Sequence, residues 1–136
     1  MQLIPYLNFN GQCEAAFKFY EQCLGGKIVM MMTHGDSPIA KDVPPDWHSA
    51  ILHASLAVDD AVLMGSDRPP DQPGETKGAY VSIAIDDLAK AKRIFNALAE
   101  GGTVQMPFAE TFWAAGFGML VDRFGTPWMI NCGRPE

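Results

Sequence analysis

The chain has 136 residues, which is the usual size of one domain. Hydrophobic residues make up 48% of it and charged residues only 19%, so the composition is that of a folded globular protein and not of a disordered chain. The 10 basic and 16 acidic residues give a formal net charge of -6 without any basic run, which excludes a nucleic-acid surface that follows the phosphates.

The first part of the chain predicts a strand followed by a helix. Residues 3–10 alternate in character and end in the turn signal Asn10-Gly11, which is typical of a strand. Residues 12–24 then carry apolar side chains at the spacing of an amphipathic helix, which Gly25-Gly26 ends because glycine tolerates the left-handed cap conformation. The apolar stripe of this helix consists of Cys13, Ala16, Phe17, Tyr20 and Leu24.

Three further strands are predicted before the middle of the chain, at 27–33, 51–58 and 61–66. The last two are joined by a tight turn at Asp59-Asp60. Residues 33–47 hold three prolines and fit no regular element. This segment is long enough to act as a lid or as a loop that binds a partner. His34 and His48 lie at its two ends, and we expect both to be in solvent.

The second half predicts the same succession of elements. A strand over 80–85 is followed by Asp86-Asp87, whose carboxylates suit the N-cap of a second helix. Gly101-Gly102 ends this helix, and strands over 103–106, 116–121 and 127–132 follow. The apolar stripe of the second helix consists of Leu88, Ala91, Phe95 and Leu98.

The order of elements is therefore βαβββ twice, with an offset of about 75 to 76 residues between equivalent positions. The glycine pair at 25–26, for example, matches the pair at 101–102. We predict a single domain, 1–136, built of two repeats at about 1–67 and 79–136, with residues 68–78 as the linker.

The three cysteines, Cys13, Cys23 and Cys132, have no CxxC spacing. Cys13 and Cys23 lie ten residues apart on the predicted helix, about 15 Å, which is too far for a disulfide. We expect three free thiols and a cytoplasmic protein. The longest apolar run, 28–32, is far shorter than the roughly 20 residues of a membrane helix, and no secretory signal is visible, so we expect no membrane partner.

Several segments, in their order and spacing, carry a likeness to a known family: 5–11, 14–17, 24–26, 64–67, 112–113 and 122–128. The chain resembles the vicinal oxygen chelate superfamily, which contains glyoxalases, bleomycin-resistance proteins and extradiol dioxygenases, and within it the PhnB-like branch. This resemblance implies an α+β fold in which tandem βαβββ modules form a curved eight-stranded mixed sheet around a cleft, with the helices outside. It also implies a homodimer.

Strand alternation predicts which side chains face that cleft. In the first strand Leu7 and Phe9 are expected under the helix, while Tyr6 and Asn8 face the cleft. In the fifth strand Val81, Ile83 and Ile85 are expected under the second helix. The cleft side of that strand would then hold Tyr80, Ser82 and Ala84.

The resemblance implies a divalent metal held from four equivalent strand positions, which are usually His and Glu. Those positions correspond here to Ile4, Met64, Tyr80 and Met129. Isoleucine has no donor atom, a thioether is a poor ligand for hard or borderline metals, and a tyrosine would have to bind as phenolate. We therefore expect no metal and no other cofactor. The alternative is a divalent metal held by relocated ligands, with His53 and Asp67 as the candidates.

The side chains expected in the cleft are aromatic or neutral and polar, which suits a small, partly aromatic ligand. His53 is the best single candidate for acid–base chemistry because histidine exchanges protons near neutral pH, although the pattern favours a histidine that only hydrogen-bonds its neighbours. The expected ligand-binding residues are Tyr6, Asn8, His53, Ser55, Met64, Tyr80, Ser82, Trp113, Met129 and Asn131.

Three hypotheses about function follow. The first is a metal-free, small-molecule-binding protein of this superfamily whose ligand is unknown. The second is a metal-dependent lyase, isomerase or dioxygenase with relocated ligands. The third is an accessory module that binds a protein through a sheet edge or the proline-rich loop. The methyl transfer associated with the PhnB-like branch finds no support, because the sequence has no nucleotide-binding glycine motif.

Overall fold

A computed structural model describes residues 1–134 of the protein, and these divide into two compact modules, of which the first is Met1–Glu75 and the second begins at Thr76. The first module contains β1 (Tyr6–Phe9), α1 (Cys13–Leu24), β2 (Lys27–Thr33), two short 3-10 helices (Ala40–Asp42 and Pro45–Trp47), β3 (Ile51–Val58) and β4 (Ala61–Asp67). The second module contains β5 (Val81–Ala84), α2 (Leu88–Ala99), β6 (Thr103–Ala109), β7 (Ala114–Val121) and β8 (Pro127–Gly133). No helix in residues 1–134 is long and apolar enough to span a membrane.

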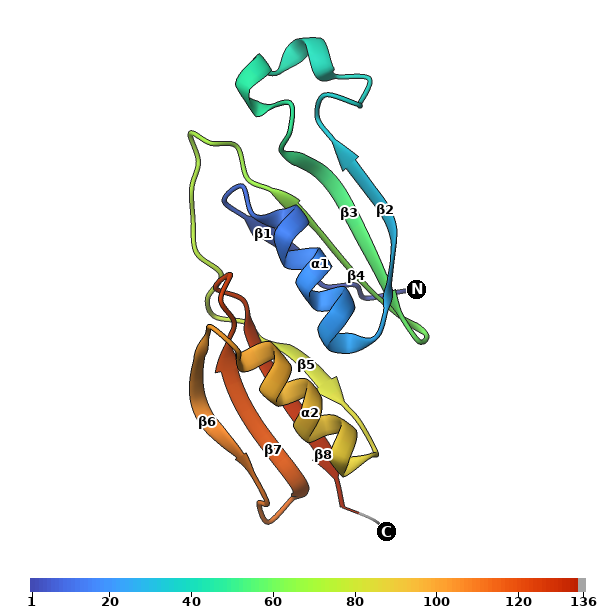
Figure 1. Ribbon diagram of the computed structural model, residues 1–136, viewed down its shortest axis with the longest axis vertical. Coiled ribbons are helices and arrows are strands. Elements are labelled where there is room, and N and C mark those ends of the chain that lie inside the picture. Colours follow the sequence, from blue (N-terminus) through green and yellow to red (C-terminus); the bar gives the residue numbers. More distant parts are fainter. Residues whose placement is uncertain (135–136) are drawn as a thin grey trace. The chain divides into compact units, whose positions relative to one another are not determined.

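The hydrogen bonds of the strands confirm the α+β fold of two βαβββ modules. The first sheet has the order β1-β4-β3-β2 and the second the order β5-β8-β7-β6 (Figure 1). In each sheet the first two strands in this order are parallel and the others antiparallel. The eight strands thus form two four-stranded mixed sheets, one in each module, where the resemblance implied a single eight-stranded sheet.

The lengths of several strands differ from the prediction. β1 spans only Tyr6–Phe9 of the predicted 3–10, and Pro5 just before it has no backbone N–H to donate to a neighbouring strand. β6 extends to Ala109, three residues beyond the predicted end, and shifts register around Met106. Such irregularities interrupt the alternation of side chains from which strand ends are predicted.

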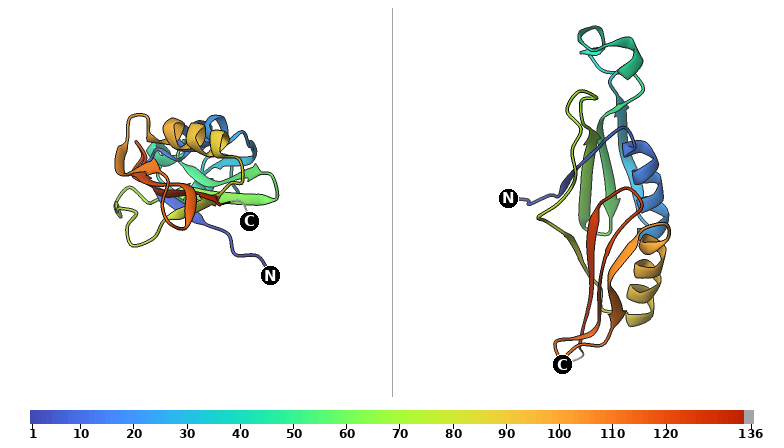
Figure 2. Two further views of the ribbon diagram at one scale, coloured as in Figure 1. Left: turned by 90° about the horizontal axis from the view of Figure 1, so that it is seen from below. Right: turned by 90° about the vertical axis from the view of Figure 1, so that its left-hand side faces the viewer.

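In each module one helix covers one face of the sheet, as Figures 1 and 2 show. In the first module Phe17 and Tyr20 of α1 pack beside Phe9 of β1, with ring centroids 5.9 to 6.4 Å apart. In the second, a Cβ atom on Gly118 would lie only 2.6 Å from a ring carbon of Phe95 in α2, so a side chain at this strand position would force the helix and the strand to shift. We call the opposite, uncovered side of each sheet its helix-free face.

The predicted division between the two faces is confirmed in both modules. Leu7 and Phe9 are buried under α1, whereas Tyr6 and Asn8 are exposed on the helix-free face. Val81 and Ile83 are half-buried, and Ser82 and Ala84, which alternate with them, are exposed. Alternation along a strand determines this pattern, so it can be derived without knowledge of the strand order.

The predicted linker, residues 68–78, belongs largely to the first module. The side-chain amide nitrogen of Asn10 donates to the carbonyl of Gly74 (2.8 Å), and the backbone N–H of Gly74 donates to Oδ1 of Asn10 (3.2 Å). Arg68 also donates to the Gly74 carbonyl (3.0 Å). These contacts hold the segment against the end of β1, which explains why the first module continues to Glu75.

Candidate functional site

A tyrosine–histidine pair lies on the helix-free face of the first module. Tyr6 projects from β1 and His53 from β3, on either side of β4. The hydroxyl of Tyr6 lies 2.9 Å from Nδ1 of His53, and the two rings are stacked with centroids 5.7 Å apart and planes inclined by 27°. His53 is half-buried and Tyr6 is 47% exposed, so the pair stands at the surface. Both residues were predicted to be in the site, and the structure brings them together.

Neutral polar groups surround this pair. Asn8 of β1 and Ser66 of β4 are register partners, and the Ser66 hydroxyl donates to Oδ1 of Asn8 (3.3 Å). Ser55 lies two residues from His53 on the same face and is buried. It faces Met64 of β4, which in turn faces Tyr6. Ser66 was not among the predicted residues, although it lies two residues after Met64 in β4 and therefore on the same face.

The helix-free face of the second module is more apolar. Ser82, Met129, Met119 and Met106 are register partners across its four strands. Asn131 lies in the next row, between Ala84 and Phe117. Three thioethers beside an aromatic ring form a surface suited to apolar contacts. Ser82, Met129 and Asn131 were predicted on this face, and the register confirms that they share it.

Tyr80 makes a contact that spans the second sheet. Its hydroxyl donates to Oε1 of Gln105 in β6 (2.9 Å), although β8 and β7 lie between β5 and β6. Side chains stand nearly perpendicular to a sheet, so this contact indicates that the sheet curls toward its helix-free face. Gln105 was not predicted, because it lies in the irregular part of β6 where alternation gives no reliable face.

Trp113 stands in an exposed aromatic cluster on the loop between β6 and β7. Its ring meets Phe112 and Phe117 edge to face, with centroids 4.8 and 5.4 Å apart. Phe112 is 88% exposed and Trp113 is 47% exposed. Trp113, an expected ligand-binding residue, is thus part of an aromatic surface that is exposed to solvent.

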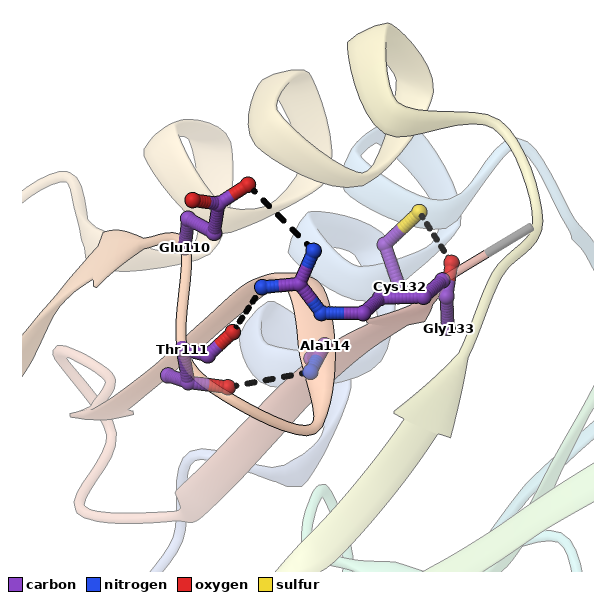
Figure 3. A network of polar contacts seen from close by, with 6 residues as sticks. Glu110, Thr111, Ala114, Cys132 and Gly133 are labelled. Carbon is purple, nitrogen blue, oxygen red and sulfur yellow. Dashed lines mark hydrogen bonds and ion pairs between the residues drawn. The ribbon is translucent and has the colours of Figure 1, made fainter. Parts of the chain in front are cut away.

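Polar contacts hold that loop to the last strand (Figure 3). The guanidinium of Arg134 donates to the carbonyl of Thr111 and lies 3.6 Å from a carboxylate oxygen of Glu110. The Thr111 hydroxyl accepts from the N–H of Ala114 (3.1 Å). The exposed rings therefore stand on a loop with a defined conformation.

Asp67, the candidate for a relocated metal ligand, has a structural role. One carboxylate oxygen accepts from the backbone N–H groups of Gly11 (3.0 Å) and Cys13 (2.9 Å), and the other accepts from that of Ile51 (2.8 Å). Asp67 is only 5% exposed. It caps the first turn of α1, whose own N-cap residue, Gln12, makes no side-chain cap. Both carboxylate oxygens are thus engaged by backbone N–H groups.

The donor set does not fit the divalent metal implied by the resemblance. Ile4 and Met64 lack the oxygen or imidazole donors that such ions prefer, and the same is true of Met129. The Tyr80 hydroxyl is already bonded to Gln105. Within residues 1–134, no three His, Cys, Asp or Glu side chains form a group that could hold a metal ion.

The expectation that His34 and His48 lie in solvent is wrong for His34. It is 6% exposed, and its ring lies 4.1 Å from that of Trp47, centroid to centroid. Burial lowers the pKa of His34, while the negative charge of Asp67 partly opposes this shift. Nε2 of His48, which is half-buried, lies 2.8 Å from the carbonyl of Ala40 and 3.2 Å from that of Val43. The segment after β2 is therefore an organised loop, in which the ring of His34 packs on Trp47 and the ring of His48 contacts two backbone carbonyls.

The prediction of free thiols is confirmed for Cys13, Cys23 and Cys132. Cys13 is fully buried, and burial, reinforced by the charge of Asp67, raises the pKa of its thiol to about 12. Cys132 is 1% exposed. A thiol nucleophile must be accessible and ionised, and neither holds for Cys13.

The sequence is similar to those of known proteins. The family model described as the glyoxalase/bleomycin resistance protein/dioxygenase superfamily matches residues 3–130. Protein YjdN from Escherichia coli (strain K12) is 36% identical over 141 residues, covering 96% of this chain and 95% of YjdN.

Two solved structures extend the comparison. Protein PA1353 from Pseudomonas aeruginosa is 51% identical, with a TM-score of 0.91 and 99% of each chain covered. The PhnB protein from Bacillus cereus, named as a candidate 3-demethylubiquinone-9 3-methyltransferase, has a TM-score of 0.81. At 20% identity, over 98% of this chain and 100% of that one, the PhnB protein shares the fold alone. The chain belongs to the glyoxalase/bleomycin resistance protein/dioxygenase superfamily.

Proposed function

We propose that the protein binds a small organic molecule on the helix-free faces of its modules and does so without a divalent metal. The observation that carries the proposal is the Tyr6–His53 pair, in which a phenol and an imidazole are oriented by a 2.9 Å hydrogen bond at a solvent-accessible surface. Ligand sites commonly combine a few oriented polar groups of this kind with apolar and aromatic surface.

The second module supports the same proposal with apolar surface. Its helix-free face offers Met119, Met129 and Phe117, and the adjacent loop offers Trp113. Exposed aromatic side chains on an ordered loop are costly to leave in water and are typical of contact surfaces. Such a surface suits the flat, apolar part of a ligand, and Ser82 and Asn131 on the same face can orient a polar part.

The competing function, metal-dependent catalysis with relocated ligands, requires His53 and Asp67 to share an ion. The Asp67 carboxylate is committed to three backbone N–H groups, and freeing it would leave the two buried donors, those of Cys13 and Ile51, without partners. This cost favours the metal-free function. We extend the proposal to a cytoplasmic homodimer with no nucleic-acid or membrane partner. Light scattering of the purified protein tests whether it is a dimer.

A thermal-shift screen of small organic molecules, run on protein purified without added metal, tests the proposed function. A compound held at 100 times its Kd should add about 2.7 kcal/mol to the free energy of unfolding. Stabilisation should persist in the presence of a strong chelator and weaken in the Tyr6→Phe and His53→Gln variants. Copurification of about one divalent ion per chain, lost in His53→Gln, would overturn the proposal in favour of the metal enzyme.

A further inference from the structure

We infer that Tyr6 fixes the protonation pattern of His53, so that Nε2–H serves as a hydrogen-bond donor for the uncharged carbonyl oxygen of a ligand. The inference rests on the proposed function in one respect, namely that the helix-free face of the first module binds a small molecule. Tyr6 is then a positioning residue that acts through His53.

The direction of the Tyr6–His53 hydrogen bond follows from the chemistry of the two groups. A neutral imidazole has one N–H donor and one unprotonated nitrogen, which is a good acceptor. A phenol hydroxyl is a strong donor and can rotate toward that nitrogen. With Nδ1 2.9 Å from the Tyr6 hydroxyl, the favourable arrangement has the phenol donating to Nδ1. The single proton of the neutral ring then resides on Nε2.

The Nε2 atom of His53 is available for a ligand. No residue within the described range 1–134 makes a hydrogen bond to it. The stacking against Tyr6, at 5.7 Å and 27°, restricts rotation of the imidazole ring. A donor that is already oriented loses less conformational entropy on binding than a mobile one, which favours affinity.

The surroundings of His53 select the chemical class of the ligand. Its register partner on β2 is Met32, and Ser55, Met64, Ser66 and Asn8 share the helix-free face with it. These groups are uncharged. The next cation along the chain from Ser66 is Arg68, whose guanidinium already donates to Asn10 and to the Gly74 carbonyl. A carboxylate beside His53 would therefore lose hydration for little electrostatic gain, whereas a carbonyl oxygen needs only one or two neutral donors. The face is therefore suited to a ketone, an amide or a related neutral carbonyl group.

Nitrogen-15 NMR of histidine-labelled protein, in the pH range where His53 is neutral, tests the positioning role. In the unmodified protein His53 should show a protonated Nε2 and an unprotonated Nδ1. In Tyr6→Phe the Nδ1 resonance should move and the two protonation patterns should mix. Tyr80→Phe is the matched control, because it removes a hydroxyl that bonds Gln105 in the other module and should leave His53 unchanged. A proton on Nδ1 in the unmodified protein, or an unchanged His53 in Tyr6→Phe, would overturn the inference.

Two probes of similar shape, acetophenone and benzoate, test the ligand class by NMR titration. Acetophenone should perturb the signals of His53 and its neighbours, and Tyr6→Phe should weaken this binding about 3- to 10-fold, the loss expected for one neutral hydrogen bond. Preferential binding of benzoate overturns the ligand class but leaves the proposed function standing. Failure of a wide compound screen to perturb either module overturns the proposed function. The protonation pattern of His53 is measured on the free protein, so it is decided independently of whether a ligand binds.

Discussion

The two modules share one topology but begin their helices in different ways. α2 has its own N-cap, Asp87, whose Oδ1 accepts from the N–H of Lys90 (3.1 Å). α1 has no such residue, and Asp67 at the end of β4 supplies the carboxylate from a distant part of the chain. Met64 and Met129 occupy equivalent positions in the two sheets. Asp67 lies three residues after Met64, and Cys132 lies three residues after Met129, so Cys132 is the equivalent of Asp67 in the second module. A local cap stabilises one helix, whereas Asp67 also joins α1 to the start of β3.

The helix-free faces differ in a related way. His53 and Phe117 occupy equivalent positions in the two sheets. Met64 pairs with Ser55, two residues after His53, and Met129 pairs with Met119, two residues after Phe117. His53 contacts a phenol, and Phe117 contacts the indole of Trp113. Burial under a helix constrains the opposite faces to be apolar in both modules. The uncovered faces carry no such requirement, so one became polar and the other aromatic.

Replacement of Asp67 should have the largest effect on stability, and it tests the difference between the helix caps of the two modules. Asp67→Ala leaves the buried backbone N–H groups of Cys13 and Ile51 without acceptors, together with that of the exposed Gly11, and should lower the free energy of unfolding by about 3–5 kcal/mol. Asp87→Ala, the matched control in the second module, removes an exposed N-cap and should cost about 1 kcal/mol. Urea denaturation measures both. Equal losses would mean that the long-range cap contributes no more than the local one.

A methyl group added at Gly118 should have the next largest effect. The new Cβ would lie 2.6 Å from the Phe95 ring and 3.0 Å from the Phe108 Cα, so α2 and β6 would have to shift. We expect Gly118→Ala to cost about 1–3 kcal/mol of unfolding free energy. Gly133→Ala, on the adjacent strand, meets nothing within 4 Å and should cost little. If thermal denaturation shows the same loss for both variants, the close packing of α2 on β7 is not the cause.

The smallest expected effect concerns Cys13 and the pH dependence of stability. Its pKa in the folded protein is raised from 9.0 to about 12, so folding favours the protonated thiol. This contribution to stability is fully present below pH 9 and is lost as the pH rises from 9 toward 12. Native protein at pH 8 should therefore leave Cys13 unmodified by iodoacetamide, as read by peptide mass spectrometry. Rapid labelling of Cys13 without unfolding would contradict its assigned burial.

The fold was largely predictable because its signals are local. The spacing of apolar residues in 12–24 and the Asp86-Asp87 signal before the second helix depend only on nearby residues. The alternation of Tyr6, Leu7, Asn8 and Phe9 likewise determined their faces. The irregular end of β6 could not be predicted, because register shifts arise from pairing with β7 rather than from the β6 sequence.

The candidate site was predictable as a set of residues but not as a set of contacts. By itself the sequence determined the two βαβββ repeats and which side chains leave the helix-covered core, because periodicity is a property of each segment. Only the tertiary structure decided that Tyr6 binds His53, 47 residues away, and that Tyr80 binds Gln105, 25 residues away. It also decided that Asp67 serves α1 rather than a metal. Such contacts depend on strand order and register, which no single segment encodes.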